Sequence, residues 1–388
     1  MFDKSIYILK FLFPFLLVIN FSNLLAQPPD SLQHFKLLFV GDIMQHDPQL
    51  EAAEIIPNVA YDYESSFKYV KPIIEKADLA VGNLELTLPG QPPYRGYPQF
   101  RAHDDFAAGL KAIGFDVMMT ANNHAHDAGK RGLINTIKTL KNNGFYQTGS
   151  FKNQKERSLF YPLMVYKNNF RLAFLNYTYG INGVKAVLPP TIVNRIDTTI
   201  IKKDLALTQL INPDFVIVFM HWGTEYHLQE SKQQQELATW LFKNGADIVV
   251  GAHPHVVQPI KWLDIPSDRE QHLAVYSMGN FISSQTTLNT NGGIIVEVEL
   301  VKNKRTNKTT IANHHYIPIW RYTQKVKKDN YNFYALPVSA FENGHEYRLK
   351  MLPEDKTAMN DFIRKMRQHL GKSDGVERVL ELEEVIKD

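Results

Sequence analysis

The clearest pattern in the chain is a series of short apolar runs that alternate with longer amphipathic stretches. Continuous apolar runs are typical of strands buried on both faces, and they predict strands at residues 34–40, 78–82, 115–120, 171–176, 214–220, 247–251, 272–277 and 293–300. Helical spacing predicts helices at 66–77, 106–113, 127–142, 233–243 and 353–370. Because strands and helices alternate, we expect an α/β fold in which helices cover sheets.

The same pattern suggests how the chain is divided. A main domain is predicted over residues 34–302, after a linker at residues 27–33. Recognisable motifs stop beyond this region, so residues 303–388 are predicted to form a C-terminal extension. We expect the acidic tail from Glu377 onwards to be loosely held.

The first 26 residues have the layout of a secretory signal peptide. Lys4 and Lys10 precede an apolar stretch at residues 11–19, and Ala26 is a small residue suited to a cleavage point. Leu24 is larger than the residue usual at its position, so an uncleaved membrane anchor is the alternative. Both interpretations place the protein outside the cytoplasm, in the periplasm or at the cell surface.

Composition narrows the class of protein. A content of 44% hydrophobic and 12% aromatic residues in 388 residues is that of a globular chain. The net charge of +3 is too small to indicate a nucleic-acid partner. The chain has no cysteine, which excludes disulfides, thiolate metal ligands and a catalytic thiol.

Polar segments with metal-binding residue types follow several of the apolar runs. They are residues 40–42, 82–85, 121–124, 221–225, 251–255 and 276–281. Ligand sites of α/β folds gather beyond the carboxyl ends of the strands. We therefore expect these segments to meet in one site.

Carboxylate, amide and imidazole groups in these segments form a candidate metal site. Its members are Asp42, Glu85, Asn123, His221, His253 and His255. Such a mixed nitrogen and oxygen set favours Mn, Fe or Zn over Ca or Cu(I), as one or two ions. Taken singly, each residue also has an ordinary explanation as a turn residue, a surface charge or a buried structural histidine.

The sequence His253-Pro254-His255 allows a prediction of where its two imidazoles point. On a regular strand, residues two apart share a face, so both imidazoles would point into the same site. Pro254 is expected to hold His253 extended.

The segment Asn122-Asn123-His124 adds a candidate proton donor. His124 could protonate a leaving group, and Asp127 could orient its ring by accepting the other N–H. The alternative is that Asp127 simply caps the helix predicted to follow it.

These motifs together resemble the CapA family, the capsule or poly-γ-glutamate synthesis proteins, which is similar to the calcineurin-like metallophosphoesterases. The resemblance covers residues 35–300 and rests on the ordered motifs Gly-Asp, Gly-Asn-Leu-Glu, Ala-Asn-Asn-His-x-x-Asp-x-Gly, His-Trp-Gly-x-Glu-Tyr, Gly-x-His-Pro-His-Val and Tyr-Ser-x-Gly-Asn-Phe. It implies a four-layer α/β/β/α sandwich. It also implies that the candidate metal residues form a metal shell, with His124 and Asp127 as catalytic residues.

Further residues are predicted to contact substrate. They are Arg101, Asn122, Glu225 and Asn280, of which Arg101 could hold a carboxylate or phosphate. The chain departs from the wider phosphoesterase pattern at Met44, where that pattern has histidine, and at Glu85, which follows Gly-Asn-Leu instead of Gly-Asp. The departures leave open whether one ion or two are bound.

Three functions are compatible with these residues. The first is metal-dependent hydrolysis or transfer on an anionic polymer, such as poly-γ-glutamate or another capsule component, or on a small anionic substrate. The second is a non-catalytic scaffold that binds the polymer or a membrane-bound synthesis and export machinery. The third is a general extracytoplasmic phosphoesterase.

Overall fold

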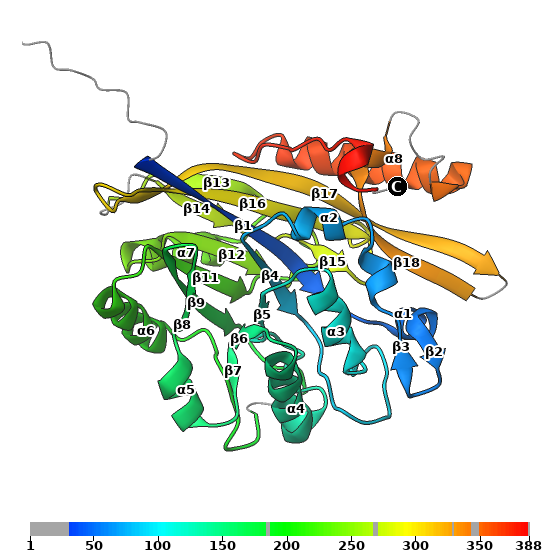
Figure 1. The fold of residues 1–388 in the computed structure, drawn as a ribbon, viewed down its shortest axis with the longest axis horizontal. Coiled ribbons are helices and arrows are strands. Elements are labelled where there is room, and N and C mark those ends of the chain that lie inside the picture. The colour runs from blue at the N-terminus through cyan, green and yellow to red at the C-terminus, as the bar shows by residue number, and fades with distance from the viewer. Residues whose placement is uncertain (1–30, 184–186, 267–270, 328–329, 343–348, 387–388) are drawn as a thin grey trace, which may run out of the picture.

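The structure is a computed structural model that describes residues 31–183, 187–266, 271–327, 330–342 and 349–386 (Figure 1). The predicted signal peptide and most of the predicted linker lie outside the described residues. Within these ranges, no helix has both the length and the apolar character needed to cross a membrane.

The first sheet has eight strands, in the order β18-β17-β16-β1-β4-β5-β6, with β15 paired to β1. Its strands are β1 (Leu32–Ile43), β4 (Leu79–Leu84), β5 (Val117–Met119), β6 (Tyr146–Thr148), β15 (Asn280–Ile282), β16 (Gly292–Asn303), β17 (Thr309–Lys327) and β18 (Asn330–Pro337). Strands β1, β4, β5 and β6 are parallel, so their carboxyl ends share one edge. The strands β16 to β18 are antiparallel additions on the other side of β1.

The second sheet has six strands, in the order β13-β14-β12-β11-β9-β8. Its strands are β8 (Leu163–Lys167), β9 (Phe170–Thr178), β11 (Phe215–His221), β12 (Ile248–Ala252), β13 (Ile260–Leu263) and β14 (His272–Val275). Strands β9, β11, β12 and β14 are parallel. Every residue of β11 is buried, as expected for a strand covered on both faces.

The two sheets pack face to face. Alternate residues of β11, including Phe215 and Phe219, belong to the same core as β1, and the rings of Phe35 and Phe170 lie 4.9 Å apart between the sheets. The other face of β11, with Val218, packs with residues of α6 (Thr198–Ile211) and α7 (Lys232–Lys243).

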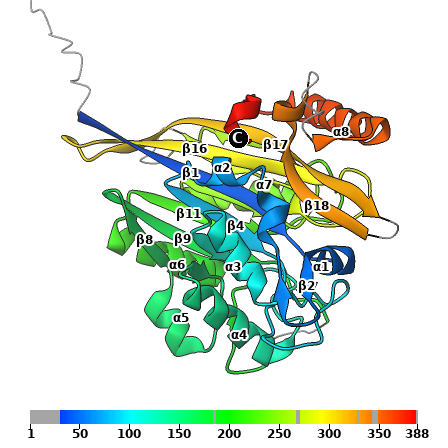
Figure 2. The ribbon, with the colours of Figure 1, turned by 45° about the vertical axis from the view of Figure 1, so that its right-hand side comes forward.

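Helices also cover the outer face of the first sheet, where α2 (Lys71–Ile74) and α3 (Asp105–Ala112) lie against it in both views (Figures 1 and 2). The predicted four-layer α/β/β/α architecture is therefore confirmed.

The remaining helices and strands complete the fold. They are α1 (Asp47–Ala53), β2 (Glu54–Ile56), β3 (Ala60–Tyr61), α4 (Gly129–Asn142), β7 (Ser150–Phe151), α5 (Gln154–Phe160), β10 (Ile192–Val193), α8 (Pro353–Leu370) and 3₁₀ turns at Glu64–Phe67, Val338–Phe341 and Leu382–Glu384. The helix predicted at residues 66–77 is wrong as a single element. It is split into a 3₁₀ turn and the four-residue α2, because Pro72 lacks the N–H needed inside a longer helix but fits a first turn.

Residues beyond 302 contribute to the same architecture. Strand β17 pairs with β16 along most of its length, and α8 packs on β17. The expectation of a loosely held tail is wrong, because Leu380, Leu382 and Val385 are buried in the main core. Arg378 adds two hydrogen bonds to the carboxylate of Glu297, at 2.7 and 2.9 Å.

Candidate metal centre

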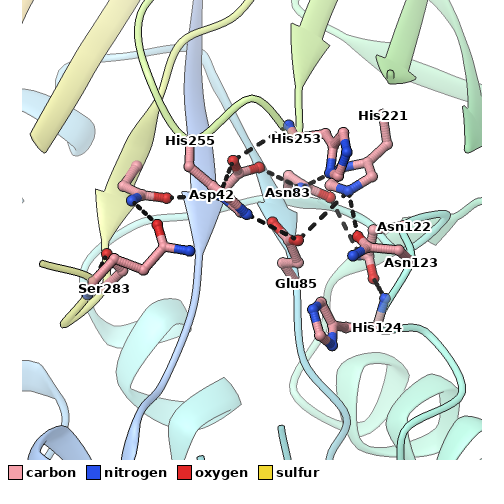
Figure 3. A network of polar contacts seen from close by, with 12 residues as sticks. Asp42, Asn83, Glu85, Asn122, Asn123, His124, His221, His253, His255 and Ser283 are labelled. Atoms are coloured by element: carbon pink, nitrogen blue, oxygen red, sulfur yellow. Dashed lines mark hydrogen bonds and ion pairs between the residues drawn. The ribbon is translucent and has the colours of Figure 1, made fainter. Parts of the chain in front are cut away.

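The candidate metal residues come from both sheets and meet at the carboxyl ends of parallel strands (Figure 3). Asp42 lies near the end of β1, and Glu85 directly follows β4. From the second sheet, His221 is the last residue of β11, and His253 directly follows β12. The strand order thus brings together residues that are far apart in sequence, as the sequence predicted.

A close backbone contact shapes this edge beside Asp42. A Cβ atom on Gly41 would lie 1.9 Å from the carbonyl oxygen of Gly279, so only glycine fits. The close approach lets the Asp42 N–H donate to the same oxygen, at 3.0 Å. The segment before Asn280 is thereby held against the end of β1.

The two histidines of His253-Pro254-His255 reach the site by a different geometry from the one predicted. Strand β12 ends at Ala252, and His253 and His255 have φ angles of 98° and 59°. The extended conformation expected for His253 is therefore wrong. Positive φ is unfavourable for residues with a Cβ, and such strain concentrates at functional sites.

Three overlapping groups of side chains could hold a metal ion. Each group has its ligand atoms within 4.8 Å of one another: Glu85, His221 and His253; Asp42, Glu85 and His255; and Glu225, His253 and His255. Asn123 joins them through its Oδ1, which lies 2.6 Å from Nε2 of His221. All the residues predicted as metal ligands therefore lie in one cluster.

Glu85 is the most unusual member of this cluster. Its side chain is fully buried, and neither carboxylate oxygen has a hydrogen-bond partner. Burial and the nearby charge of Asp42 raise the pKa of Glu85 well above its usual value. A buried carboxylate without donors is unfavourable, and a bound cation would remove the penalty.

The imidazoles are suited to bind a cation. Burial and the neighbouring His253 lower the pKa of His221 well below its usual value. Burial, followed by the charge of His255, lowers the pKa of His253 to about 3. Both rings are therefore neutral near pH 7, which is the form that ligates metals.

Asp42 keeps its charge despite its burial. Burial alone would raise its pKa, but hydrogen bonding and positive charge from His255 lower the pKa well below the usual range. Its Oδ2 lies 3.0 Å from Nδ1 of His255, and its Oδ1 accepts from Nδ2 of Asn83 at 2.8 Å. Asn83, which also lies 3.2 Å from Nδ1 of His221, was not predicted as a site residue although it stands in a predicted segment.

His124 and Asp127 form a buried pair beside the cluster. Nδ1 of His124 lies 2.7 Å from Oδ2 of Asp127, which also accepts from the N–H of Phe100 at 2.6 Å. Helix α4 begins at Gly129 with Ala128 as its N-cap, so the capping alternative for Asp127 is wrong. The contact predicted between the two side chains is present.

The residues predicted to contact substrate lie in different positions. Asn122 donates to Oδ1 of Asn83 and to the backbone oxygen of Leu84, so its amide connects the loop after β5 to the end of β4. Asn280 lies 3.1 Å from Nδ1 of His255. Glu225 belongs to one of the possible ligand groups.

Arg101 was predicted to contact substrate but is not linked to the cluster in the described part of the chain, whereas Tyr179 lies beside the cluster and was not predicted. Across the described residues, no hydrogen bond or ion pair is seen between the Arg101 side chain and the cluster, and its backbone pairs with Arg95. Tyr179 was not predicted, yet its ring centre lies 4.4 Å from that of His253. The available signal was its place directly after β9, which matches the other site residues.

Sequence comparison assigns the chain to a family. Residues 36–285 match the family described as bacterial capsule synthesis protein PGA_cap, and the chain belongs to that family. It is 30% identical over 287 residues to the capsule biosynthesis protein CapA of Bacillus anthracis, a match that covers 71% of this chain and 66% of that protein, just under two thirds. It is 29% identical over 300 residues to the PGA biosynthesis protein CapA of Bacillus subtilis (strain 168), covering 75% and 74% of the two chains.

Structural comparison gives weaker similarities. The calcineurin-like phosphoesterase YfkN from Bacillus subtilis aligns with 88% of this chain and 100% of its own, at 14% identity and a TM-score of 0.42. A TM-score below 0.5 establishes neither activity nor substrate for this chain.

Proposed function

We propose that this chain is an exported, metal-dependent enzyme of capsule or poly-γ-glutamate biosynthesis that hydrolyses or transfers a unit of an anionic polymer. The observation that carries this proposal is the buried carboxylate of Glu85, which has no hydrogen-bond partner and lies among imidazoles and Asp42. Membership of the capsule synthesis family supports the choice of polymer.

The residues of the cluster fit a divalent ion such as Mn, Fe or Zn. The proposed ligands are Asp42, Glu85, Asn123, His221, His253 and His255, which together offer oxygen and neutral nitrogen atoms. An ion held there would polarise a carbonyl or phosphoryl oxygen and lower the pKa of a bound water.

The chain itself supplies the proton transfer. Asp127 accepts the Nδ1 proton of His124, which fixes the ring orientation, and Nε2 lies 3.4 Å from Nδ2 of Asn182, a contact that the substrate would replace. In the proposed reaction, His124 acts as an imidazolium: it gives its Nε2 proton to the leaving oxygen or nitrogen and keeps its Nδ1 proton in the hydrogen bond to Asp127. Asn122 ties its loop to β4 by donating to Asn83, and Asn280 of β15 ties the loop of His255 to the first sheet.

Elemental analysis after loading with manganese, iron or zinc tests the proposal. We expect about one or two ions per chain, and their loss in His253→Ala. Turnover of γ-glutamyl polymers and an aryl phosphate by the loaded protein would then distinguish polymer chemistry from general phosphoesterase activity.

A non-catalytic scaffold is the second candidate. The observation in its favour is Met44, which is buried in the core where the wider phosphoesterase pattern has a histidine. Absence of metal after every loading, together with polymer binding, would favour the scaffold. Association with a membrane-bound synthesis machinery belongs to either proposal.

A further inference from the structure

Arg321 is a mostly buried cation that has no carboxylate partner within the described chain. From β17, its Nη1 donates to Oγ1 of Thr323 at 2.7 Å and its Nη2 to the backbone oxygen of Gln285 at 3.0 Å. Its Nε has no partner, and burial lowers its pKa to about 10. A buried guanidinium is normally paired with an anion, so two neutral acceptors leave the charge of Arg321 uncompensated.

Arg321 lies beside the candidate metal centre. Gln285, which accepts from Arg321, also accepts through its Oε1 from Nδ2 of Asn280 at 2.8 Å. Oδ1 of Asn280 in turn lies 3.1 Å from Nδ1 of His255. Two residues, Gln285 and Asn280, therefore connect Arg321 to the proposed metal ligand His255 through hydrogen bonds.

His46 contacts the same segment of the chain as Arg321. Its pKa is lowered to about 4, first by burial and then by the positive charges of His255 and Arg321. Its Nδ1 accepts from the N–H of Ser284, the residue before Gln285. The adjacent residues Ser284 and Gln285 therefore contact His46 and Arg321 respectively.

We propose that Arg321 is an anion-binding subsite of this centre and that it takes an oxyanion of the substrate, either a carboxylate or a phosphate. The inference rests on the proposed function and adds a residue beyond the family match at residues 36–285. A guanidinium binds both oxyanions through two parallel hydrogen bonds. Arg321 as a whole residue is half-buried and therefore not fully enclosed.

Equilibrium binding to the full chain tests this subsite. A γ-glutamyl oligomer and tripolyphosphate are titrated separately into manganese-loaded and metal-free protein, so that tighter binding of one identifies carboxylate or phosphate as the preferred anion. We expect Arg321→Met to weaken binding about tenfold or more, Arg321→Lys to weaken it less, and salt to affect the Met variant less than the wild type. The control is Arg364→Met, which removes an exposed arginine of α8 paired with Asp361.

Two results would overturn the inference. One is that neither anion binds the wild type or that Arg321→Met binds both as tightly as the wild type. The other is that Arg321→Met loses metal or lowers the melting temperature while Arg321→Lys fails to restore binding, which would make Arg321 an anchor of the loop at Gln285. Metal content and turnover of His253→Ala test the proposed function separately.

Discussion

Glu85, directly after β4, and Glu297, on β16, are both buried carboxylates of the eight-stranded sheet region, but their surroundings differ. Glu297 on β16 receives two hydrogen bonds from Arg378 of the C-terminal tail. Glu85 receives none on either oxygen. At Glu297 the chain supplies its own cation, so the pair holds the tail against the sheet. Among the described residues, the groups within ion-pair distance of Glu85 are imidazoles, with Nε2 of His221 at 3.5 Å and Nε2 of His255 at 3.9 Å from its Oε1. None of them donates a hydrogen bond to it, so we expect a cation from solution to be the favourable partner.

The largest effect is expected at the proposed catalytic pair, His124 and Asp127, beside the cluster. Replacing His124 by alanine removes the proposed proton donor but no predicted metal ligand. Turnover should fall roughly 100- to 10,000-fold while metal content and melting temperature stay unchanged. Steady-state kinetics on the manganese-loaded protein measure this, with His227→Ala as a control at an exposed histidine outside the cluster. Unchanged turnover in His124→Ala would refute the proton-donor role.

The second-largest effect tests the difference between Glu85 and Glu297 directly. Glu85→Gln should lower metal affinity roughly 100-fold or more, because an anionic ligand is lost. The metal-free variant should be as stable as the wild type or more stable, since a buried carboxylate without donors has been removed. Chelator competition measures the affinity, and urea unfolding in EDTA measures the stability. A variant that binds metal normally would remove Glu85 from the ligand set.

Glu297→Gln should give the opposite pattern. Metal affinity should stay the same, and the free energy of unfolding should fall by roughly 1–3 kcal/mol because charged hydrogen bonds from Arg378 are weakened. Urea unfolding checks the loss. The matched control is Glu236→Gln, whose exposed pair with Lys232 should contribute no more than about 0.5 kcal/mol. Equal losses in both variants would show that burial of Glu297 has no special effect.

Sequence patterns predicted much of this arrangement for a physical reason. Apolar runs mark strands buried on both faces, and polar residues directly after such runs must lie at a sheet edge. Asp42, Glu85, His221 and His253 were all located by this rule. A different rule, helical spacing, failed at residues 66–77, where the effect of Pro72 outweighed that spacing.

The parts that could not be predicted depend on contacts between distant segments. The positive φ angles of His253 and His255 arise in a loop whose shape no local pattern specifies. Asn83 acquires its role only because β1 and β11, from different sheets, approach it from two sides. Arg321 belongs to a strand without any recognisable motif, and its relation to the centre passes through Gln285.

The smallest effect concerns pH and the metal-free protein. The pKa of His253 is about 3 in the folded chain against 6.5 for an unperturbed histidine, so between these values the unfolded state binds more protons. Stability should therefore fall as pH drops from about 6.5 towards 3, and this group should contribute up to about 1.4 kcal/mol per pH unit. His253→Asn should reduce that slope in urea unfolding at pH 7, 6 and 5 with EDTA, whereas His227→Asn controls for loss of a histidine elsewhere. An identical slope in His253→Asn and the wild type would mean that the ring of His253 is not held neutral by burial, and the cluster would then lose one of its arguments for metal binding.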